Sequence, residues 1–357
     1  MSGFAAELPV RGRRVLVVGG GDRVLGRVAA LRDAGADVHV VGPTAAASIA
    51  DLAERGLLRW DRRVVTAADV GSAALVILDE ATAAAQVRSW ADEHGIFCLE
   101  PATASPRAAA GAGKVVLVGG GPGDPGLLTV AGLAAIKQAE VIVTDRLAPL
   151  AVLDQAPAGV EIVDVGKIPR GRFTPQERIN QLLVEHARAG RRVVRLKGGD
   201  NFVFGRGGEE WQACAEAGIE VQVIPGVSSA VGVPGLAGIP LTHRTANQGF
   251  TVITAHVPPG DPRSTLDYAA LARTGTALVI MMGVATLSAV TAELIRHGLH
   301  PGTPAATIAD GGLPGQRTVR GTVVSIADAA AAAGIRPPAI TVIGSVAAFD
   351  PTTGDVG

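Results

Sequence analysis

The stretch KVVLVGGGPGD, residues 114–124, decides the fold of this 357-residue chain. Its apolar run is rich in β-branched residues and ends in a glycine turn, which is typical of a buried parallel strand that leads into a helix. The stretch RRVLVVGGGD, residues 13–22, shows the same pattern nearer the amino terminus. The pair therefore predicts two separate α/β units rather than an array of repeats.

Outward from these stretches, apolar runs alternate with helical patterns, which indicates layered α/β domains. In the first unit we expect strands at 14–18, 37–41, 63–66, 74–78 and 96–99 and a helix at about 24–34. In the second we expect strands at 115–118, 141–144, 160–165, 192–196, 220–224, 250–254, 276–281, 304–308 and 339–343. Thr174 is expected to cap a helix that begins with Pro175, and Ser325 to begin another.

Two segments are typical of boundaries between domains. Residues 101–113 are small residues, prolines and one arginine, a composition that cannot build a core. The segment RTANQG near 244–249 separates two αβ blocks. We therefore expect a Rossmann-like domain at 1–100, a linker at 101–113, and two lobes at 114–244 and 245–348.

Composition narrows the class of protein. The formal net charge is −1 and aromatic residues make up 3% of the chain, so neither a charge field nor a stacking surface for nucleic acids is indicated. The two cysteines, Cys98 and Cys214, predict neither a disulfide framework nor a structural zinc site. Charges or glycines interrupt each apolar run before it is long enough to cross a bilayer. We expect a cytoplasmic protein without a metal and without a nucleic acid or a membrane as partner.

The glycine turn after residue 118 contains Pro122, which removes an amide donor that a phosphate cradle would use. The turn therefore favours an uncharged or cationic ligand group over a pyrophosphate, and a tight turn without any ligand explains this motif equally well when it is taken alone. Further motifs follow it in order: RLKGGD at 195–200, FGRGGEE at 204–210, PGVSS at 225–229 and GIPLTHR at 238–244.

Together with DRL at 145–147 and VGK at 165–167, this series resembles the tetrapyrrole methylase family, most closely its uroporphyrinogen-III C-methyltransferase branch. The resemblance covers residues 114 to about 348. It implies a two-lobed αβ domain of the class III methyltransferase type, which binds S-adenosylmethionine between its lobes and acts as a homodimer. The implied reaction transfers two methyl groups to C2 and C7 of uroporphyrinogen III and gives precorrin-2, on the route to sirohaem and cobalamin.

The resemblance also implies roles for single residues. Asp145 and Lys167 match the family's proton acceptor and donor, although a turn aspartate and a lysine that clamps a substrate carboxylate are the alternatives. The implied cofactor contacts are Pro122, Gly198, Gly199, Asp200, Val203, Ser228, Ser229, Met282 and Gly311. Because uroporphyrinogen III is a polycarboxylate, we expect cationic side chains to bind it, with Arg146, Arg170, Arg172, Arg206 and Arg244 as candidates and Lys197 as a further one. Three residues depart from the family pattern: Asn201, Ala255 and Met281.

The first hundred residues resemble the amino-terminal Rossmann domain of sirohaem synthase, a precorrin-2 dehydrogenase and ferrochelatase. Gly19, Gly20 and Gly21 follow a strand and could admit the pyrophosphate of NAD. The family's acidic residue maps near Asp79 or Glu80, but the helical region that follows the Rossmann domain in the family is replaced here by the linker. A bifunctional sirohaem synthase is therefore the alternative function, while a remnant that binds a nucleotide or stabilises a dimer is favoured.

Overall fold

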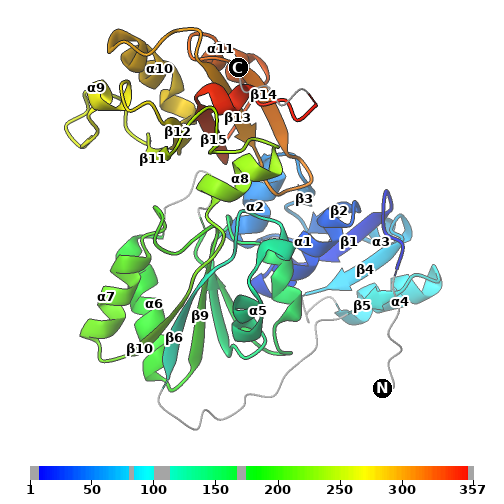
Figure 1. Cartoon of the computed structure of the whole chain (residues 1–357). Coiled ribbons are helices and arrows are strands. Elements are labelled where there is room, and N and C mark those ends of the chain that lie inside the picture. The colour runs from blue at the N-terminus through cyan, green and yellow to red at the C-terminus, as the bar shows by residue number, and fades with distance from the viewer. Residues whose placement is uncertain (1–7, 80–83, 100–112, 167–173, 353–357) are drawn as a thin grey trace. The chain divides into compact units, whose positions relative to one another are not determined.

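The computed structural model describes residues 8–79, 84–99, 113–166 and 174–352 (Figure 1). The chain divides into two compact units. The first comprises residues 1–120 with 125–226, and the second comprises residues 121–124 with 227–357. The first unit holds two parallel sheets, and the second holds a mixed sheet. The chain is therefore an α/β protein, as predicted.

The first sheet has the strand order β3-β2-β1-β4-β5. Its strands are β1 (Arg14–Val18), β2 (Asp37–Val41), β3 (Arg59–Asp61), β4 (Leu75–Leu78) and β5 (Cys98–Leu99). Its helices are η1 (Asp22–Val24), α1 (Leu25–Asp33), α2 (Ala47–Glu54), α3 (Ala67–Gly71) and α4 (Ala84–Glu93). Successive residues of β1 point to opposite faces, so that Leu16 packs with α3 and α4 while Val15 and Val17 pack with α1 and α2.

The strand predicted at 63–66 is wrong, because the third strand of this sheet is β3 at Arg59–Asp61. The residues that follow it are used in a different way. Thr66 caps α3 in a capping box with Asp69, and Arg63 forms an ion pair with the Asp69 carboxylate at 2.7 Å. Capping competes with strand formation for the backbone groups of such a segment.

The second sheet has the order β10-β6-β9-β7-β8. Its strands are β6 (Lys114–Gly119), β7 (Val141–Thr144), β8 (Glu161–Asp164), β9 (Arg192–Lys197) and β10 (Glu220–Ile224). Its helices are η2 (Pro125–Leu127), α5 (Val130–Ile136), η3 (Leu150–Gln155), α6 (Gln176–Arg188) and α7 (Gly207–Glu216). Figure 1 shows α6 and α7 side by side, and both pack on the face opposite to α5. The predicted capping role of Thr174 is wrong, because Pro175 is the capping residue of α6 and no side chain caps this helix.

The third sheet has the order β11-β12-β15-β13-β14. Its strands are β11 (Phe250–Thr254), β12 (Ala277–Met281), β13 (Pro304–Ala309), β14 (Arg317–Thr322) and β15 (Ala339–Ile343). Its helices are α8 (Ser229–Leu236), α9 (Tyr268–Leu271), η4 (Val284–Thr286), α10 (Leu287–Arg296), α11 (Ile326–Ala332) and η5 (Ser345–Ala348). β14 was not predicted, because this edge strand is polar and lacks a buried residue.

α8 covers one face of the third sheet, where Ala230 and Val233 pack with residues of β12, β13 and β15. α10 and α11 cover the other face. Because of this packing, the second compact unit already includes α8 and begins at Val227. The domain boundaries that we expect from the sequence, including the one at 244/245, stay proposals.

Candidate functional site

The predicted residues of the first lobe lie in loops that follow the carboxyl ends of parallel strands. Asp145 and Arg146 follow β7, and Gly198, Gly199 and Asp200 follow β9. β7 and β9 are hydrogen-bonded neighbours, in register from Val141 with Val193 to Thr144 with Leu196. Ligands of open α/β sheets are bound at this edge. The edge is therefore the candidate site of the first unit.

A buried network of charges holds Asp145. Nη2 of Arg195 lies 2.9 Å from Oδ2 of Asp145, and Nε of Arg195 lies 3.0 Å from Oε1 of Glu210. Nζ of Lys197 lies 2.9 Å from the same Oε1 atom. Glu210 is fully buried, and its Oε2 atom has no hydrogen-bond partner among the described residues. Two cations and two carboxylates thus compensate one another in the interior of the lobe.

Burial changes the proton affinity of these groups. It lowers the pKa of Lys197, and the neighbouring charge of Arg195 lowers it further. Burial alone would also lower the pKa of Arg195, but the carboxylates of Glu210 and Asp145 raise it. Arg195 is therefore a permanent cation beside Asp145. Because Lys197 is buried against Glu210, the structure gives it an internal partner rather than the exposed position that a surface clamp would have.

The loop after β9 is shaped by close backbone packing. A Cβ atom on Gly198 would lie 2.7 Å from the carbonyl carbon of Leu147, so only glycine fits there. Oδ1 of Asp200 accepts hydrogen bonds from the amides of Phe202 and Val203, and Oδ2 accepts one from the amide of Gly226. The Asp200 carboxylate thus orders its own loop, and the predicted contact with the cofactor stays a prediction.

Asn201, one of the departures from the family pattern, has a structural explanation. Its side chain is fully buried, and Nδ2 donates to the carbonyl oxygens of Ile224 at 2.9 Å and Leu117 at 3.3 Å. These carbonyl groups belong to β10 and β6. The amide side chain therefore ties the loop to two neighbouring strands.

The candidate arginines lie in different surroundings. Arg206 has a positive φ of 59°, caps α7 and pairs with Glu209, with about half of each side chain exposed. Arg244 is exposed in a turn that the His243–Asn247 bridge closes. Arg146 is half-buried, and its Nη1 atom lies 3.3 Å from Oδ1 of Asp51. Lys167, Arg170 and Arg172 lie outside the described residues, so their predicted roles are not tested.

The second unit gathers most of its predicted cofactor contacts around α8. Ser228 caps α8, and its Oγ atom accepts a hydrogen bond from the Ala230 amide. A Cβ atom on Gly232 would lie 3.3 Å from Cγ of Pro122, and one on Gly311 would lie 2.6 Å from Cγ2 of Val233. These contacts bring Pro122 and Gly311 to the surface of the same helix. Ser229 is the first residue of α8.

Met282 follows β12, as Gly311 follows β13. Met281 pairs with Ile340 and Ala309 pairs with Ala339, so both strands end at the same edge of the third sheet. Met282 has a positive φ of 55° and is 49% exposed. A non-glycine residue in this conformation is uncommon and marks a position worth testing. The unit therefore presents Met282 and Gly311 on one edge.

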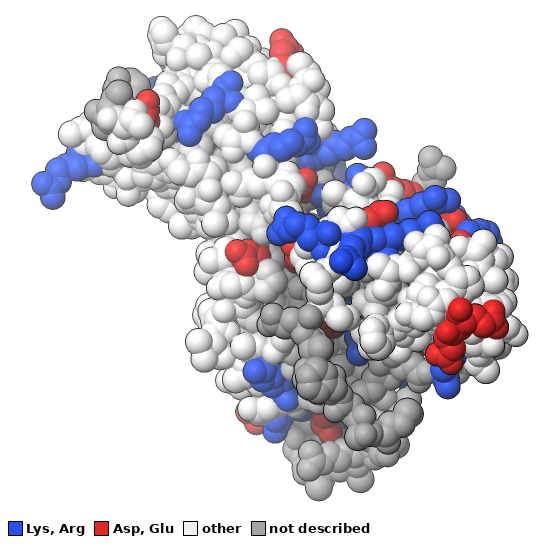
Figure 2. All heavy atoms as spheres, turned by 90° about the vertical axis from the view of Figure 1, so that its right-hand side faces the viewer, with Lys and Arg blue, Asp and Glu red and all other residues white. Residues whose placement is uncertain are grey.

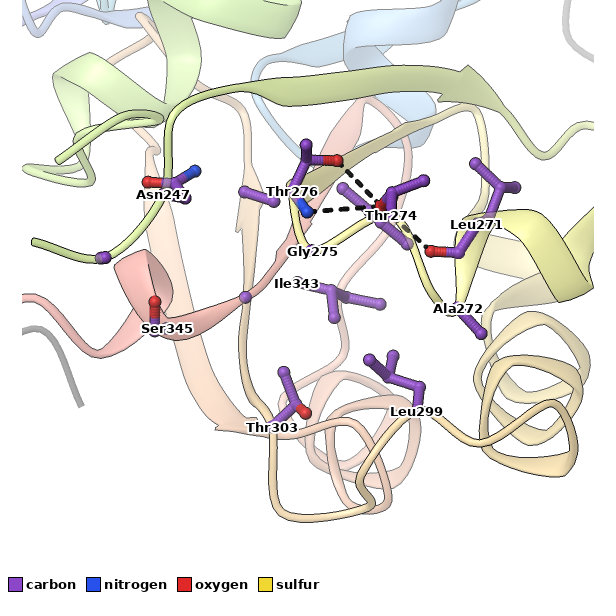
Figure 3. Close-up of a pocket in the computed structure, with 14 residues that line it drawn as sticks. Asn247, Leu271, Ala272, Thr274, Gly275, Thr276, Leu299, Thr303, Ile343 and Ser345 are labelled. Atoms are coloured by element: carbon purple, nitrogen blue, oxygen red, sulfur yellow. Dashed lines mark hydrogen bonds between the residues drawn. The ribbon is translucent and has the colours of Figure 1, made fainter. Parts of the chain in front are cut away.

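A cavity of about 180 Å³ lies at the opposite edge of the third sheet (Figure 3). Figure 3 shows Thr274 and Thr276 joined by a hydrogen bond, with Ile343 and Thr303 lining the same space. The lining offers hydroxyl, amide and apolar groups but no carboxylate or basic side chain. It is thus remote from Met282 along β12 and carries no acid–base chemistry.

In the glycine turn of the first sheet, one backbone amide is already bound to a carboxylate. The Gly21 amide donates to Oδ2 of Asp79 at 2.6 Å, and the Ser48 amide donates to Oδ2 of Asp164 at 2.7 Å. Burial, together with the charge of Asp164, raises the pKa of Asp22 to about 6. A pyrophosphate would therefore enter among carboxylates that already accept the amides at this edge. Of the two acidic positions proposed from sequence, Glu80 lies outside the described residues.

Charges elsewhere on the surface are mixed. Figure 2 shows Lys and Arg side chains in a band on one face, with Asp and Glu side chains among and below them. Among the described residues, no group of three His, Cys, Asp or Glu side chains is placed to hold a metal ion. Within the same ranges, no helix combines the length and the hydropathy that a membrane span requires.

The sequence matches known families and proteins over most of its length. Residues 114–347 match the family model described as Tetrapyrrole (Corrin/Porphyrin) Methylases, and residues 7–103 match one described as putative NAD(P)-binding. The S-adenosyl-L-methionine-dependent uroporphyrinogen III methyltransferase of Methanosarcina barkeri is 47% identical over 234 residues, which are 66% of this chain and 92% of that protein. The siroheme synthase of Tolumonas auensis is 47% identical over 240 residues, which are 67% of this chain and 50% of that protein.

The chain therefore spans about half the length of the siroheme synthase that it matches. Among solved structures, the uroporphyrin-III C-methyltransferase of Thermus thermophilus complexed with S-adenyl homocysteine is 39% identical, with a TM-score of 0.56. The match covers 67% of this chain and 100% of that one. With a family model that matches residues 114–347, this chain belongs to the tetrapyrrole (corrin/porphyrin) methylase family.

Proposed function

We propose that the chain transfers methyl groups from S-adenosylmethionine to uroporphyrinogen III. The observation that carries this proposal is the carboxylate of Asp145, which the buried Arg195 holds at the end of β7. It lies in a segment that is 47% identical to a protein named a uroporphyrinogen III methyltransferase. A sheet edge with an oriented carboxylate suits a reaction in which a carbon nucleophile is methylated and a proton is then removed.

The proposed chemistry requires few groups from the protein. A ring carbon of the substrate attacks the methyl carbon and forms a bond to it. At the same time the bond between the methyl carbon and the sulfonium sulfur breaks, and the sulfur keeps the electron pair. Positioning of the two reactants supplies much of the acceleration of such a step. The methylated ring system then loses a proton, which Asp145 accepts in our proposal. Asp145 then passes this proton to solvent, so that each methyl transfer releases one proton, and Lys167 is carried over from the family pattern as the proposed proton donor.

The proposed cofactor contacts come from loops that the two units contribute separately. The first unit offers Gly198, Gly199, Asp200 and Val203 after β9, and the second offers Pro122, Ser228, Ser229, Met282 and Gly311. For the substrate we propose carboxylate contacts from Arg146, Arg170, Arg172, Arg206 and Arg244. Arginine suits this role because its planar group binds a carboxylate through two hydrogen bonds.

The finer assignment is also a proposal. We infer two successive methylations, at C2 and C7, which give precorrin-2 for sirohaem or cobalamin synthesis, by a cytoplasmic homodimer. The alternative of a bifunctional sirohaem synthase requires NAD in the first sheet. The Gly21 amide donates a hydrogen bond to the Asp79 carboxylate, so it is not available to the pyrophosphate of NAD, and this disfavours the alternative.

The proposal is tested by anaerobic incubation of the full chain with uroporphyrinogen III and S-adenosylmethionine that carries an isotopic label on its methyl group. We expect label in the tetrapyrrole fraction. Asp145→Asn should reduce its rate of appearance while the protein stays folded. A wild-type chain that is folded and transfers no label would refute the proposal.

A further inference from the structure

Helix α1 of the first sheet packs against η3 of the second sheet. The second sheet and its helices are called the methylase lobe below. A Cβ atom on Gly26 would lie 2.8 Å from the amide nitrogen of Asp154 and 2.9 Å from Cβ of Leu153, so glycine permits this close approach of α1 to η3. Leu25 and Val28 of α1 belong to the same buried apolar cluster as Leu153. This contact resembles the interior of a domain rather than a loose association of two domains.

Polar contacts continue from this apolar patch along the carboxyl edges of both sheets. The Asp51 carboxylate of α2 lies 3.3 Å from Nη1 of Arg146, which follows β7. The Ser48 amide, in the first turn of α2, donates to the carboxylate of Asp164 at the end of β8. Asp164 also donates its own amide hydrogen to Oδ2 of Asp22 at 3.5 Å. The edge that would receive a dinucleotide in a Rossmann domain is thus occupied by side chains and backbone of the methylase lobe.

We propose that the amino-terminal domain binds the carboxyl edge of the second sheet, where the substrate is proposed to bind, instead of binding a dinucleotide. In this proposal Asp51 is the positioning residue for Arg146. The inference rests on the proposed function, in which Arg146 binds a substrate carboxylate. An arginine side chain loses much rotational freedom when it binds an anion. An ion pair made before substrate arrives has already restricted Arg146, so less freedom remains to be lost on binding. About a quarter of the Arg146 side chain is exposed, which leaves part of it accessible to a second anion.

The first test is Asp51→Asn in the full chain, with Asp33→Asn as the matched control. Asp33 ends α1 and pairs with Arg32 at 2.9 Å, within the amino-terminal domain. For Asp51→Asn we expect the KM for uroporphyrinogen III to rise about fivefold, as expected for one partly exposed ion pair. The KM for S-adenosylmethionine and the value of kcat should stay unchanged, and Asp33→Asn should change neither KM. An unchanged or lower KM for uroporphyrinogen III in Asp51→Asn would overturn the positioning role.

Two measurements do not depend on turnover and so separate this proposal from the proposed function. Calorimetric titration of the wild-type chain with NAD up to about 1 mM should give no saturable heat, and saturable binding within that range would overturn the proposal. Hydrogen exchange should become faster in Asp51→Asn at the amides of 144–155 but not at those of β13. Equal exchange at 144–155 in both proteins would show that the amino-terminal domain does not hold this edge.

Discussion

Arg195 lies between two carboxylates, with Nη2 at 2.9 Å from Asp145 and Nε at 3.0 Å from Glu210. Only 4% of its side chain is exposed, whereas a quarter of the Asp145 side chain is exposed. The buried Glu210 therefore fixes Arg195, and Arg195 in turn fixes the carboxylate of Asp145, which solvent and ligands can reach. Oδ2 of Asp145 is bound by Arg195, and Oδ1 accepts a hydrogen bond from the Leu147 amide at 3.1 Å, so both oxygens orient the carboxylate at the edge of the sheet.

Asp145→Asn should reduce kcat for methyl transfer by about 10²- to 10⁴-fold, the range typical of a lost general base. Binding of S-adenosylmethionine should be almost unchanged, because Asp145 is not among the proposed cofactor contacts. Rapid-quench measurement of a single turnover checks the first expectation, and calorimetry checks the second. A variant that turns over at the wild-type rate would assign Asp145 to the turn alone.

Glu210→Gln should lower the free energy of unfolding by about 3 kcal/mol, because it leaves Arg195 and Lys197 buried with one carboxylate fewer. Glu209→Gln is the matched control at the neighbouring position. Its ion pair with Arg206 is about half exposed, so its loss should cost less than about 1 kcal/mol. Urea denaturation of both variants gives the comparison, and equal losses would mean that the buried network does not stabilise the lobe.

Gly198→Ala should destabilise the chain and weaken binding of S-adenosylmethionine, because its Cβ atom would lie against the backbone of Leu147 and displace the loop after β9. Gly208→Ala is the control, since a Cβ atom there meets nothing within 4 Å and the residue lies in the first turn of α7. The control should be neutral or slightly stabilising. Thermal unfolding measures the change in stability of both variants, and calorimetry measures their affinity for S-adenosylmethionine. Similar behaviour of the two variants would contradict the tight packing at Gly198.

Asp22 should make the stability of the chain depend on pH. Its pKa is raised from 3.8 to about 6, chiefly by burial, so the folded chain holds this proton more tightly than the unfolded chain. Below about pH 4 both states carry the proton and Asp22 costs nothing. The cost grows between pH 4 and pH 6 and is complete above pH 6. Asp22→Asn should therefore raise the free energy of unfolding by about 1 to 3 kcal/mol at pH 7.5 and change it little at pH 4.

The control for this prediction is Asp37→Asn at the exposed start of β2. It should leave the free energy of unfolding nearly unchanged at both values of pH. Stabilisation by Asp22→Asn that is equal at pH 4 and pH 7.5 would show that the effect does not come from ionisation.

Buried strands were the part of the fold that the sequence predicted well. β1, β2, β7 and β15 have the expected bounds, because each is a largely apolar run closed by turn residues. β10 and β11 have the expected bounds as well, although they are only partly buried. β14 could not be found in this way, since an edge strand with polar side chains lacks that pattern. The strand predicted at 63–66 is wrong because its two valines resemble a strand but lead directly to Thr66, the capping residue of α3.

For the site, the sequence could name Asp145 and the glycine-rich loops but not the network behind them. Arg195 and Glu210 are 15 residues apart, and only the packing of α7 against the sheet brings them together. The pairing of Asp51 with Arg146 joins residues 95 positions apart and has no signal in local pattern. The acidic Glu210 in the motif FGRGGEE could have been singled out only by the argument that a buried strand containing Arg195 and Lys197 needs an anion.

Methyl transfer by this chain is tested most directly by the mass of the tetrapyrrole that the purified full chain produces under anaerobic conditions from uroporphyrinogen III and S-adenosylmethionine, with and without NAD. We expect a product that has gained two methyl groups and whose mass and absorbance do not depend on NAD. A product without any added methyl group, from folded protein, would contradict the proposed methyl transfer. An NAD-dependent loss of two hydrogens after methylation would contradict the role proposed for the amino-terminal domain.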